Sequence, residues 1–317
     1  MAKRNVVLGT IKDYEFDVVN PFLSTLHSTG YSGDVVLFHC NIAERTVARL
    51  RRMGVILVPF QDSFPYLEPT LAKHIGWGED RRIQTLDIYC LRHLLAYCYL
   101  KELANEYQHI MLTDIRDVIF QKDPFDFPIG GRLCCFMERE GISFRGQSMN
   151  AEWMEIAFNG STLERFYDNA IVCVGVTIGP SHLIIDYLTK MIDLFTKAPG
   201  MGWGTDQAVH NYLVHDGLLP KIRLYENNNG PVLTLGLEDQ VLVDCCGVII
   251  NKRGDIPNIV HQYDRHWQVA KRFYTFQLIW KRSRVRAGLS RMLRARTPRM
   301  YRALVRVRQV LSRSQCL

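Results

Sequence analysis

The first 113 residues alternate between short apolar runs and longer amphipathic stretches, and this alternation constrains the fold more than any other feature. Apolar runs at 5–10, 34–39 and 55–58 have the length of buried strands, and helical patterns at about 16–27 and 43–53 separate them. Strands that alternate with helices form a parallel sheet whose faces the helices cover. The sequence therefore predicts an α/β domain.

Beyond this region the pattern mixes strands and helices, which predicts a mixed sheet flanked by helices. The N-terminus of the helix at 205–214 carries Thr205, a residue type that favours the N-cap position. The remaining expected elements are a long helix over 82–104, strands at 109–113, 133–137 and 171–178, a helix over 181–196, and short strands near 241–243, 248–250 and 258–261.

Charge is distributed unevenly along the chain. Residues 265–317 hold 15 Lys and Arg and no acidic residue, whereas the first 264 residues hold 24 basic and 32 acidic ones. Met300, Leu304, Val307 and Leu311 lie at helical spacing within the basic segment. We therefore expect a mildly acidic domain, residues 1–267, followed by a basic amphipathic helical tail, residues 268–317.

The cysteines and the apolar runs indicate a cytoplasmic protein. None of the nine cysteines lies in a CxxC motif, although Cys134-Cys135 and Cys245-Cys246 are adjacent pairs. We expect free thiols in a reducing compartment. The apolar stretch at the N-terminus is too short for a signal peptide, and no run reaches the length of a membrane span.

Two carboxylates follow the apolar strand expected at 109–113. Asp114 and Asp117 flank Arg116 in the sequence MLTDIRDVIF. A buried charge without a partner is costly, so we expect these groups to pair with one another, with water or with a bound species. Ligands bind beyond the carboxyl ends of strands in open α/β sheets, which favours a site here. A simple surface turn stays the alternative.

Two later segments also combine polar and aromatic residues. In GWGTDQ the exposed tryptophan Trp203 precedes Asp206 and Gln207 at an expected helix start, where an acidic residue also suits the helix dipole. In IVHQYDRHW the histidine His261 ends a short apolar strand and could equally be a core residue. Neither a phosphate-binding G-x-x-x-x-G-K-[ST] loop nor a G-x-G-x-x-G fingerprint is present.

Taken together and in this order, these segments resemble the GT-A-fold glycosyltransferases, over about residues 4–267. In that family a Rossmann-like half binds a nucleotide-sugar, and an Asp-x-Asp motif at a strand end holds a divalent cation. The run TDIRD resembles the spaced form of this motif, in which two residues separate the carboxylates. His261 resembles the histidine that comes late in the sequence of glycogenin-like families. The resemblance implies that Asp114, Asp117 and His261 are ligands of Mn²⁺ or Mg²⁺.

The resemblance also implies contacts to the donor, a nucleotide-sugar. The expected nucleotide-sugar contacts are Thr10, Arg82, Gly175, Arg265 and His266. Gly175 lies in CVGVTIG, which resembles the Asn-Ala-Gly-Val strand of these families with Cys173 where asparagine is usual. Glycogenin-like families favour retention of anomeric configuration, with Asp206 or Gln207 as catalytic residues, and we expect Trp203 to contact the acceptor.

Several functions stay open at this point. The leading hypothesis is a metal-dependent glycosyltransferase with a glycan or lipid-linked acceptor, as in bacterial surface polysaccharide assembly. The alternative is a non-catalytic, degenerate GT-A module, and a nucleotidyltransferase is a third class, although GTIKDYEF is not its Gly-rich loop. The basic tail predicts peripheral binding to an anionic membrane surface. Solvated helices packed on the domain are the alternative, and nucleic acid is not expected as a partner.

Overall fold

The computed structural model of the protein describes residues 3–61, 87–198 and 203–274. The chain forms two compact units, Met1–Tyr263 and Asp264–Leu317. The first unit holds the β-sheets. The described part of the second unit carries one short helix, α9 (Trp267–Ala270). The predicted division of the chain at residue 267 stays a prediction.

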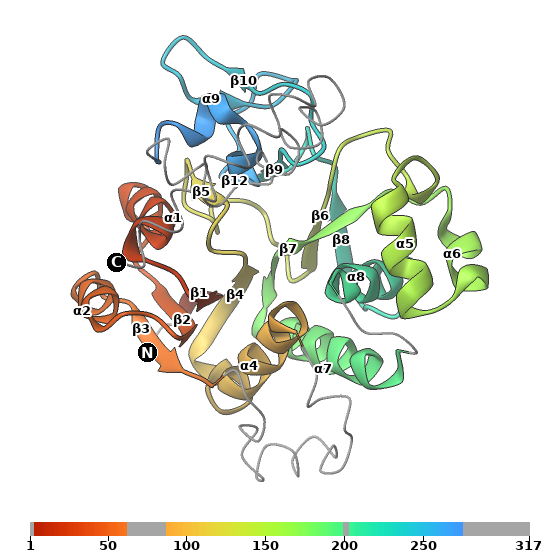
Figure 1. Cartoon of the computed structure of the whole chain (residues 1–317), viewed down its shortest axis with the longest axis horizontal. Helices are drawn as coiled ribbons and strands as arrows, with labels where there is room; N and C mark the ends of the chain where they lie inside the picture. Colours follow the sequence, from red (N-terminus) through yellow and green to blue (C-terminus); the bar gives the residue numbers. More distant parts are fainter. Residues whose placement is uncertain (1–2, 62–86, 199–202, 275–317) are drawn as a thin grey trace, which may run out of the picture. The chain divides into compact units, whose positions relative to one another are not determined.

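A seven-stranded mixed sheet forms the centre of the first unit, in the order β3-β2-β1-β4-β7-β6-β8 (Figure 1). The four strands β3, β2, β1 and β4 are parallel. Strand β7 is antiparallel to both β4 and β6, and β8 is parallel to β6. The predicted mixed α/β sheet is therefore confirmed. The strands are β1 (Arg4–Lys12), β2 (Asp34–Cys40), β3 (Ile56–Pro59), β4 (Tyr107–Thr113), β6 (Leu133–Met137), β7 (Val172–Pro180) and β8 (Ile222–Tyr225).

Helices cover both faces of this sheet, which explains why its strands are apolar runs. In β1 the side chains of Val6 and Leu8 enter one hydrophobic core, and those of Val7 and Ile11 enter the core on the opposite face. The first core contains residues of α4, α7 and α8, and the second contains residues of α1 and α2. In Figure 1 the helices α4 and α7 lie side by side. The helices are α1 (Phe16–Ser28), α2 (Glu44–Arg52), α4 (Ile88–Leu103), α5 (Ser148–Ala157), α6 (Gly160–Phe166), α7 (Ser181–Lys197) and α8 (Thr205–His215).

A small sheet brings a late segment next to the end of β4. It consists of β5 (Val118–Phe120), β12 (Ile259–His261) and β9 (Val232–Thr234), with β12 in the middle. Strand β12 is antiparallel to β5, and His261 lies opposite Val118. A separate hairpin joins β10 (Leu242–Val243) and β11 (Ile249–Ile250). The pairing of β5 with β12 places residues about 145 positions apart in one site.

Most predicted elements are present, but the start of α8 differs from the prediction. Gly204 is the N-cap, with φ of 90°, and Thr205 is the buried first residue of the helix. The predicted N-cap at Thr205 is therefore wrong, because glycine adopts this left-handed conformation without strain. Elements not predicted are α5, α6, β5, β8 and β9.

Two predictions fall outside the described residues. The start of the long helix at Arg82 is one of them; within the described residues α4 spans Ile88–Leu103, and the Asp87 carboxylate caps it by accepting from Cys90 N at 3.0 Å. The helices of the basic tail, within residues 275–317, are the other. Among the described residues, none of the helices has both the length and the apolar character to cross a membrane.

Candidate functional site

Asp114, Asp117 and His261 converge at the end of β4. One potential ligand atom from each residue lies within 4.8 Å of the others. His261 Nε2 is 3.4 Å from Asp114 Oδ2 and 3.9 Å from Asp117 Oδ1. The structure thus brings together the three residues that the sequence predicted as metal ligands.

Backbone hydrogen bonds hold each member of this cluster. Asp114 N donates to Gly175 O on β7 at 2.9 Å, which fixes the residue at the end of β4. Gln262 N donates to Asp117 O at 2.7 Å and so joins the start of β5 to the end of β12. Strand pairing rather than a flexible loop therefore positions the cluster, as precise ligand geometry requires.

The cluster fits a divalent cation. Nε2 of His261 is buried and has no hydrogen-bond partner among the described residues, and it faces the two carboxylates. Gly175 leaves the space for this arrangement, because a Cβ there would lie 2.3 Å from His261 Cε1 and 2.8 Å from Asp114 Oδ2. Carboxylate oxygens with one imidazole nitrogen suit Mg²⁺ or Mn²⁺.

Arg92 on α4 connects this cluster to α8. Its Nη1 pairs with Asp114 Oδ1, and its Nη2 donates to Asp206 Oδ2 at 2.7 Å. His93 Nε2 lies 3.9 Å from the same oxygen of Asp206. A single guanidinium therefore joins the predicted metal ligand Asp114 to the predicted catalytic residue Asp206.

These contacts set the charge states of the site. Burial alone would raise the pKa of Asp114, but Arg92 and His261 hold it well below the ordinary range of a carboxyl. Burial opposes ionisation of Asp206 too, and Arg92 with His93 lowers its pKa overall. Burial would lower the pKa of His261, yet Cys173 and Asp114 raise it above its usual value. Asp114 and Asp206 are thus ionised, and in the absence of a cation a proton on His261 offsets part of their charge.

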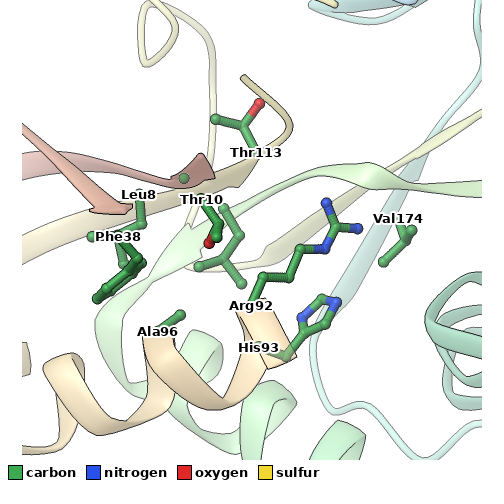
Figure 2. A pocket seen from close by; sticks show the side chains of 10 residues that line it. Leu8, Thr10, Phe38, Arg92, His93, Ala96, Thr113 and Val174 are labelled. Atoms are coloured by element: carbon green, nitrogen blue, oxygen red, sulfur yellow. The ribbon is translucent and has the colours of Figure 1, made fainter. Parts of the chain in front are cut away.

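A narrow pocket opens beside Arg92, with a cavity volume of about 20 Å³, which is room for about one water molecule. Figure 2 shows the side chain of Arg92 extending from α4 into this pocket. Thr10, near the end of β1, also lines it, as the prediction of a nucleotide contact requires. The remaining lining residues come from β1, β2, β4, β7 and α4: Leu8, Gly9, Phe38, His93, Ala96, Leu112, Thr113 and Val174.

Side-chain amides attach α8 to β7. Gln207 Oε1 accepts from Val174 N at 2.9 Å, and its Nε2 donates to Val172 O at 3.0 Å. Asn211 Oδ1 accepts from Val172 N at 2.8 Å, and its Nδ2 donates to Val172 O at 2.8 Å. Both amides thus replace the hydrogen bonds of a neighbouring strand, and they place Asp206 at a fixed distance from β7.

Of the other predicted site residues, the structure describes Trp203, Arg265 and His266 but not Arg82. Trp203 is 46% exposed, and its ring lies edge-on to Trp153 at 4.8 Å, so it is accessible to an acceptor. Arg82 lies outside the described residues. Arg265 and His266 belong to the second unit, where Arg265 Nε donates to Asp264 Oδ1 at 3.2 Å. The roles of all four stay predictions.

Sequence reasoning missed Arg92 and Asn211, and it noted Cys173 only as a departure from the Asn-Ala-Gly-Val strand. A signal for Arg92 exists, since it is the only Asp, Glu, Lys or Arg between Ile88 and Leu100. A lone charge in such an apolar helix indicates a buried partner. Asn211 follows Gln207 by four residues on the same helix face. Only the structure shows that this spacing turns both side-chain amides toward the backbone of β7.

Comparisons with known proteins identified structural neighbours only. No protein-family model matches the sequence, and no curated protein matches it. A crystal structure of the galactosyltransferase LgtC with donor and acceptor sugar analogues is 14% identical, with a TM-score of 0.46 over 87% of this chain and 95% of that chain. The glycosyltransferase GlyE of Streptococcus pneumoniae TIGR4 is 15% identical, with a TM-score of 0.48 over 88% of this chain and 62% of that one.

A third neighbour contains manganese. It is core-mannan synthase A of Aspergillus fumigatus in its Mn/GDP form, 13% identical, with a TM-score of 0.40 over 72% of this chain and 74% of that chain.

Proposed function

We propose that the protein is a metal-dependent glycosyltransferase that moves a sugar from a nucleotide-sugar to an acceptor. The observation that carries this proposal is the cluster of Asp114, Asp117 and His261 at the end of β4, joined by Arg92 to the pocket at the ends of β1 and β4. A cation beside a pocket of this kind suits a diphosphate, whose charge the cation neutralises.

The ligand set supports Mn²⁺ or Mg²⁺ as the cofactor. Asp114 and Asp117 would supply hard oxygen ligands, and His261 would supply one nitrogen, which shifts the preference toward Mn²⁺. When bound, the cation would act as a Lewis acid toward the departing diphosphate. Thr10 and Arg92 would contact the nucleotide-sugar, and Arg92 would add positive charge beside its phosphates.

Retention of anomeric configuration is the finer part of this proposal. Asp206 is the carboxylate that shares Arg92 with the ligand Asp114, so it is the better candidate to face the reacting sugar. The amide of Gln207 is occupied by the backbone of β7 and by Asn150 Oδ1 at 3.2 Å, which favours a positioning role. The anomeric form of the product, read by proton NMR, distinguishes retention from inversion.

A second pocket supports a place for the acceptor. Its cavity volume is about 270 Å³, and it is lined by both apolar and polar residues from the β10–β11 hairpin, the end of β9 and the segment after β6. Leu235 lines it and donates its N to the backbone oxygen of His261 at 2.9 Å, which links the pocket lining to a cluster residue through the main chain. The Nδ2 atom of Asn228, which also lines it, is buried without a hydrogen-bond partner among the described residues. This mixture suits the hydroxyls and apolar ring faces of a glycan.

A charge placed in this pocket tests the acceptor site. Leu242→Asp would add a carboxylate to the pocket lining, and Val243→Asp is the matched control, because Val243 is equally exposed and does not line the pocket. We expect Leu242→Asp to lower transfer at least tenfold while hydrolysis of the donor persists. Equal effects of both substitutions would place the acceptor elsewhere, and a Trp203→Ala variant then tests the predicted stacking residue.

Metal-dependent nucleotide binding tests the proposal as a whole. Nucleoside diphosphates are titrated by calorimetry with and without Mn²⁺, and a panel of nucleotide-sugars is screened for hydrolysis. We expect binding that requires Mn²⁺, and its loss in Asp114→Ala and Asp117→Ala with the fold intact. The control is Asp126→Ala, an exposed carboxylate outside the cluster. Absence of nucleotide binding at every metal concentration would favour the non-catalytic module.

We further propose that the basic segment after residue 280 holds the enzyme at an anionic membrane, where it acts on a lipid-linked acceptor of bacterial surface polysaccharide assembly. Each Lys or Arg near such a surface contributes about 1 kcal/mol, and salt weakens the attraction. Deletion of residues 281–317 should leave donor hydrolysis intact and abolish co-sedimentation with vesicles of anionic lipid. Unchanged co-sedimentation of the truncated chain would exclude this role.

A further inference from the structure

Cys173 lies behind the histidine of the cation cluster. It is the second residue of β7, two positions before Gly175, and both residues lie against the ring of His261. Its Sγ is 3.5 Å from Nδ1 of His261, and the two side chains are buried, with the residues only 4% and 1% exposed. The imidazole ring of His261 therefore contacts the thiol through one nitrogen and faces the carboxylates through the other.

A histidine that binds a metal through Nε2 carries its proton on Nδ1. That proton needs an acceptor, and the group that accepts it fixes both the tautomer and the orientation of the ring. Thiol sulfur is a weak acceptor, but for His261 the only partner of Nδ1 identified within the described part of the chain is Cys173 Sγ. The opposite nitrogen, Nε2, lies 3.4 Å from Asp114 Oδ2 and has no hydrogen-bond partner there.

We propose that Cys173 is a positioning residue whose sulfur accepts the Nδ1 proton of His261 and thereby holds Nε2 toward the cation, an inference that rests on the proposed metal-dependent function. The thiol itself is not a ligand in this arrangement. Nδ1 and Nε2 point in different directions from the ring, so a sulfur beside Nδ1 faces away from the cation position. Gly175 completes the slot, because a Cβ there would lie 2.6 Å from Nε2.

Affinity for Mn²⁺ tests this role without any measurement of catalysis. Free Mn²⁺ is quantified by electron paramagnetic resonance in titrations of the full chain and of its Cys173→Ala, Cys173→Val and Cys173→Ser variants. We expect about a 10- to 100-fold loss of affinity when the acceptor is removed in the first two, as for other groups that orient metal ligands. The Cys173→Ser variant keeps an acceptor and should bind within about threefold of the wild-type protein.

A second buried strand cysteine provides the matched control. Cys135 on β6 is fully buried and is not part of the cluster, so Cys135→Ala should leave Mn²⁺ affinity unchanged even if it lowers the melting temperature. Wild-type affinity in both Cys173→Ala and Cys173→Val would overturn the proposal. So would equal losses in Cys173→Ser and Cys173→Ala, because packing rather than hydrogen bonding would then be responsible.

The wild-type protein supplies an independent measurement if a variant fails to fold. In the Mg²⁺-loaded protein labelled with ¹⁵N-histidine, we expect the His261 signals of a protonated Nδ1 and an unprotonated Nε2. The reverse tautomer would overturn the proposal. Failure of the metal site itself has a different signature: the wild-type protein and Asp114→Ala would then show the same weak Mn²⁺ binding, and the inference about Cys173 would fall with it.

Discussion

Arg92 and Asp206 form a buried ion pair between α4 and α8, with Nη2 of the arginine 2.7 Å from Oδ2 of the aspartate. Their side chains are only 14% and 5% exposed. Removal of one partner from such a pair leaves a buried charge without compensation. The cost of this charge in unfolding free energy exceeds the net stabilisation that the intact pair provides.

We therefore predict that Arg92→Met lowers the free energy of unfolding by about 3–5 kcal/mol. The double variant Arg92→Met/Asp206→Asn should recover at least about 1 kcal/mol of this loss, because the unpaired charge of Asp206 is gone. Urea denaturation of the single and double variants measures the coupling. The exposed pair of Lys197 and Asp193 is the control, and Lys197→Met should cost less than about 1 kcal/mol. Strictly additive effects of the Arg92 and Asp206 substitutions would contradict the prediction.

The stability of the protein should fall in mild acid because of a buried histidine. Burial lowers the pKa of His210 to about 3, and the Tyr187 hydroxyl lies 2.9 Å from its Nδ1. In the unfolded chain this pKa is about 6.5, so the unfolded state binds the proton more readily between these two values. The histidine therefore stabilises the fold above pH 6.5, and this contribution is lost as the pH falls toward 3.

The expected slope is up to about 1.4 kcal/mol of unfolding free energy per pH unit for this one proton. Denaturant unfolding between pH 7 and pH 4 measures it. His210→Gln should lower the slope by that amount, whereas replacement of the exposed His27 by Gln should leave it unchanged. An identical slope in wild-type protein and His210→Gln would show that His210 does not govern the acid sensitivity.

Asn211 should contribute to stability through the two backbone groups of Val172 that it binds. Asn211→Leu would leave a buried N–H and a buried carbonyl with fewer partners, each at a cost of about 1–3 kcal/mol. We expect a loss of about 2–4 kcal/mol in unfolding free energy, measured by thermal or urea denaturation. Asn229→Leu, at an exposed position of the loop before β9, is the control and should change stability by less than about 0.5 kcal/mol. Equal effects at both positions would contradict this role.

The parts of the fold that the sequence predicted are those with strong local periodicity. The run Leu133–Met137 was predicted residue for residue, because both faces of β6 are buried and apolar. Strand β9 has only three residues, and its pairing with β12 is set by tertiary contacts rather than by local preference. The predicted start of α8 was wrong by one residue. Thr205 is a residue type that suits an N-cap, but the left-handed backbone conformation of Gly204 makes Gly204 the N-cap.

The residues of the candidate site likewise divide into those that the local sequence indicates and those that only tertiary packing brings together. Asp114, Asp117 and His261 were predicted as ligands from the resemblance to GT-A glycosyltransferases, whereas the local sequence showed only that each ends or follows an apolar strand. Arg92 was not predicted, since it lies in the interior of a helix and only the packing of α4 against α8 brings it to Asp206. A sequence shows which residues end strands, but the partners of a helical residue depend on how the helices pack.

Gly175 should be required for cation binding, because its missing side chain is the space that His261 occupies. A Cβ at this position would lie 2.3 Å from His261 Cε1 and 2.8 Å from Asp114 Oδ2, distances that no relaxed structure tolerates. The carbonyl of Gly175 accepts from Asp114 N, and β7 pairs with β4 from Val176 onward, so we expect the histidine rather than the backbone to move. We predict that Gly175→Ala lowers Mn²⁺ affinity at least tenfold and costs about 1–3 kcal/mol of stability through overpacking.

The matched control for this substitution is Gly146→Ala, where a Cβ would meet nothing within 4 Å. That variant should bind Mn²⁺ normally and unfold within about 0.5 kcal/mol of the wild-type protein. Titration with Mn²⁺ and urea denaturation of both variants separate a local effect on the cluster from a general effect of alanine. If Gly175→Ala bound Mn²⁺ as the wild-type protein does, His261 could leave its slot without loss of the cation, and its assignment as the third ligand would be wrong.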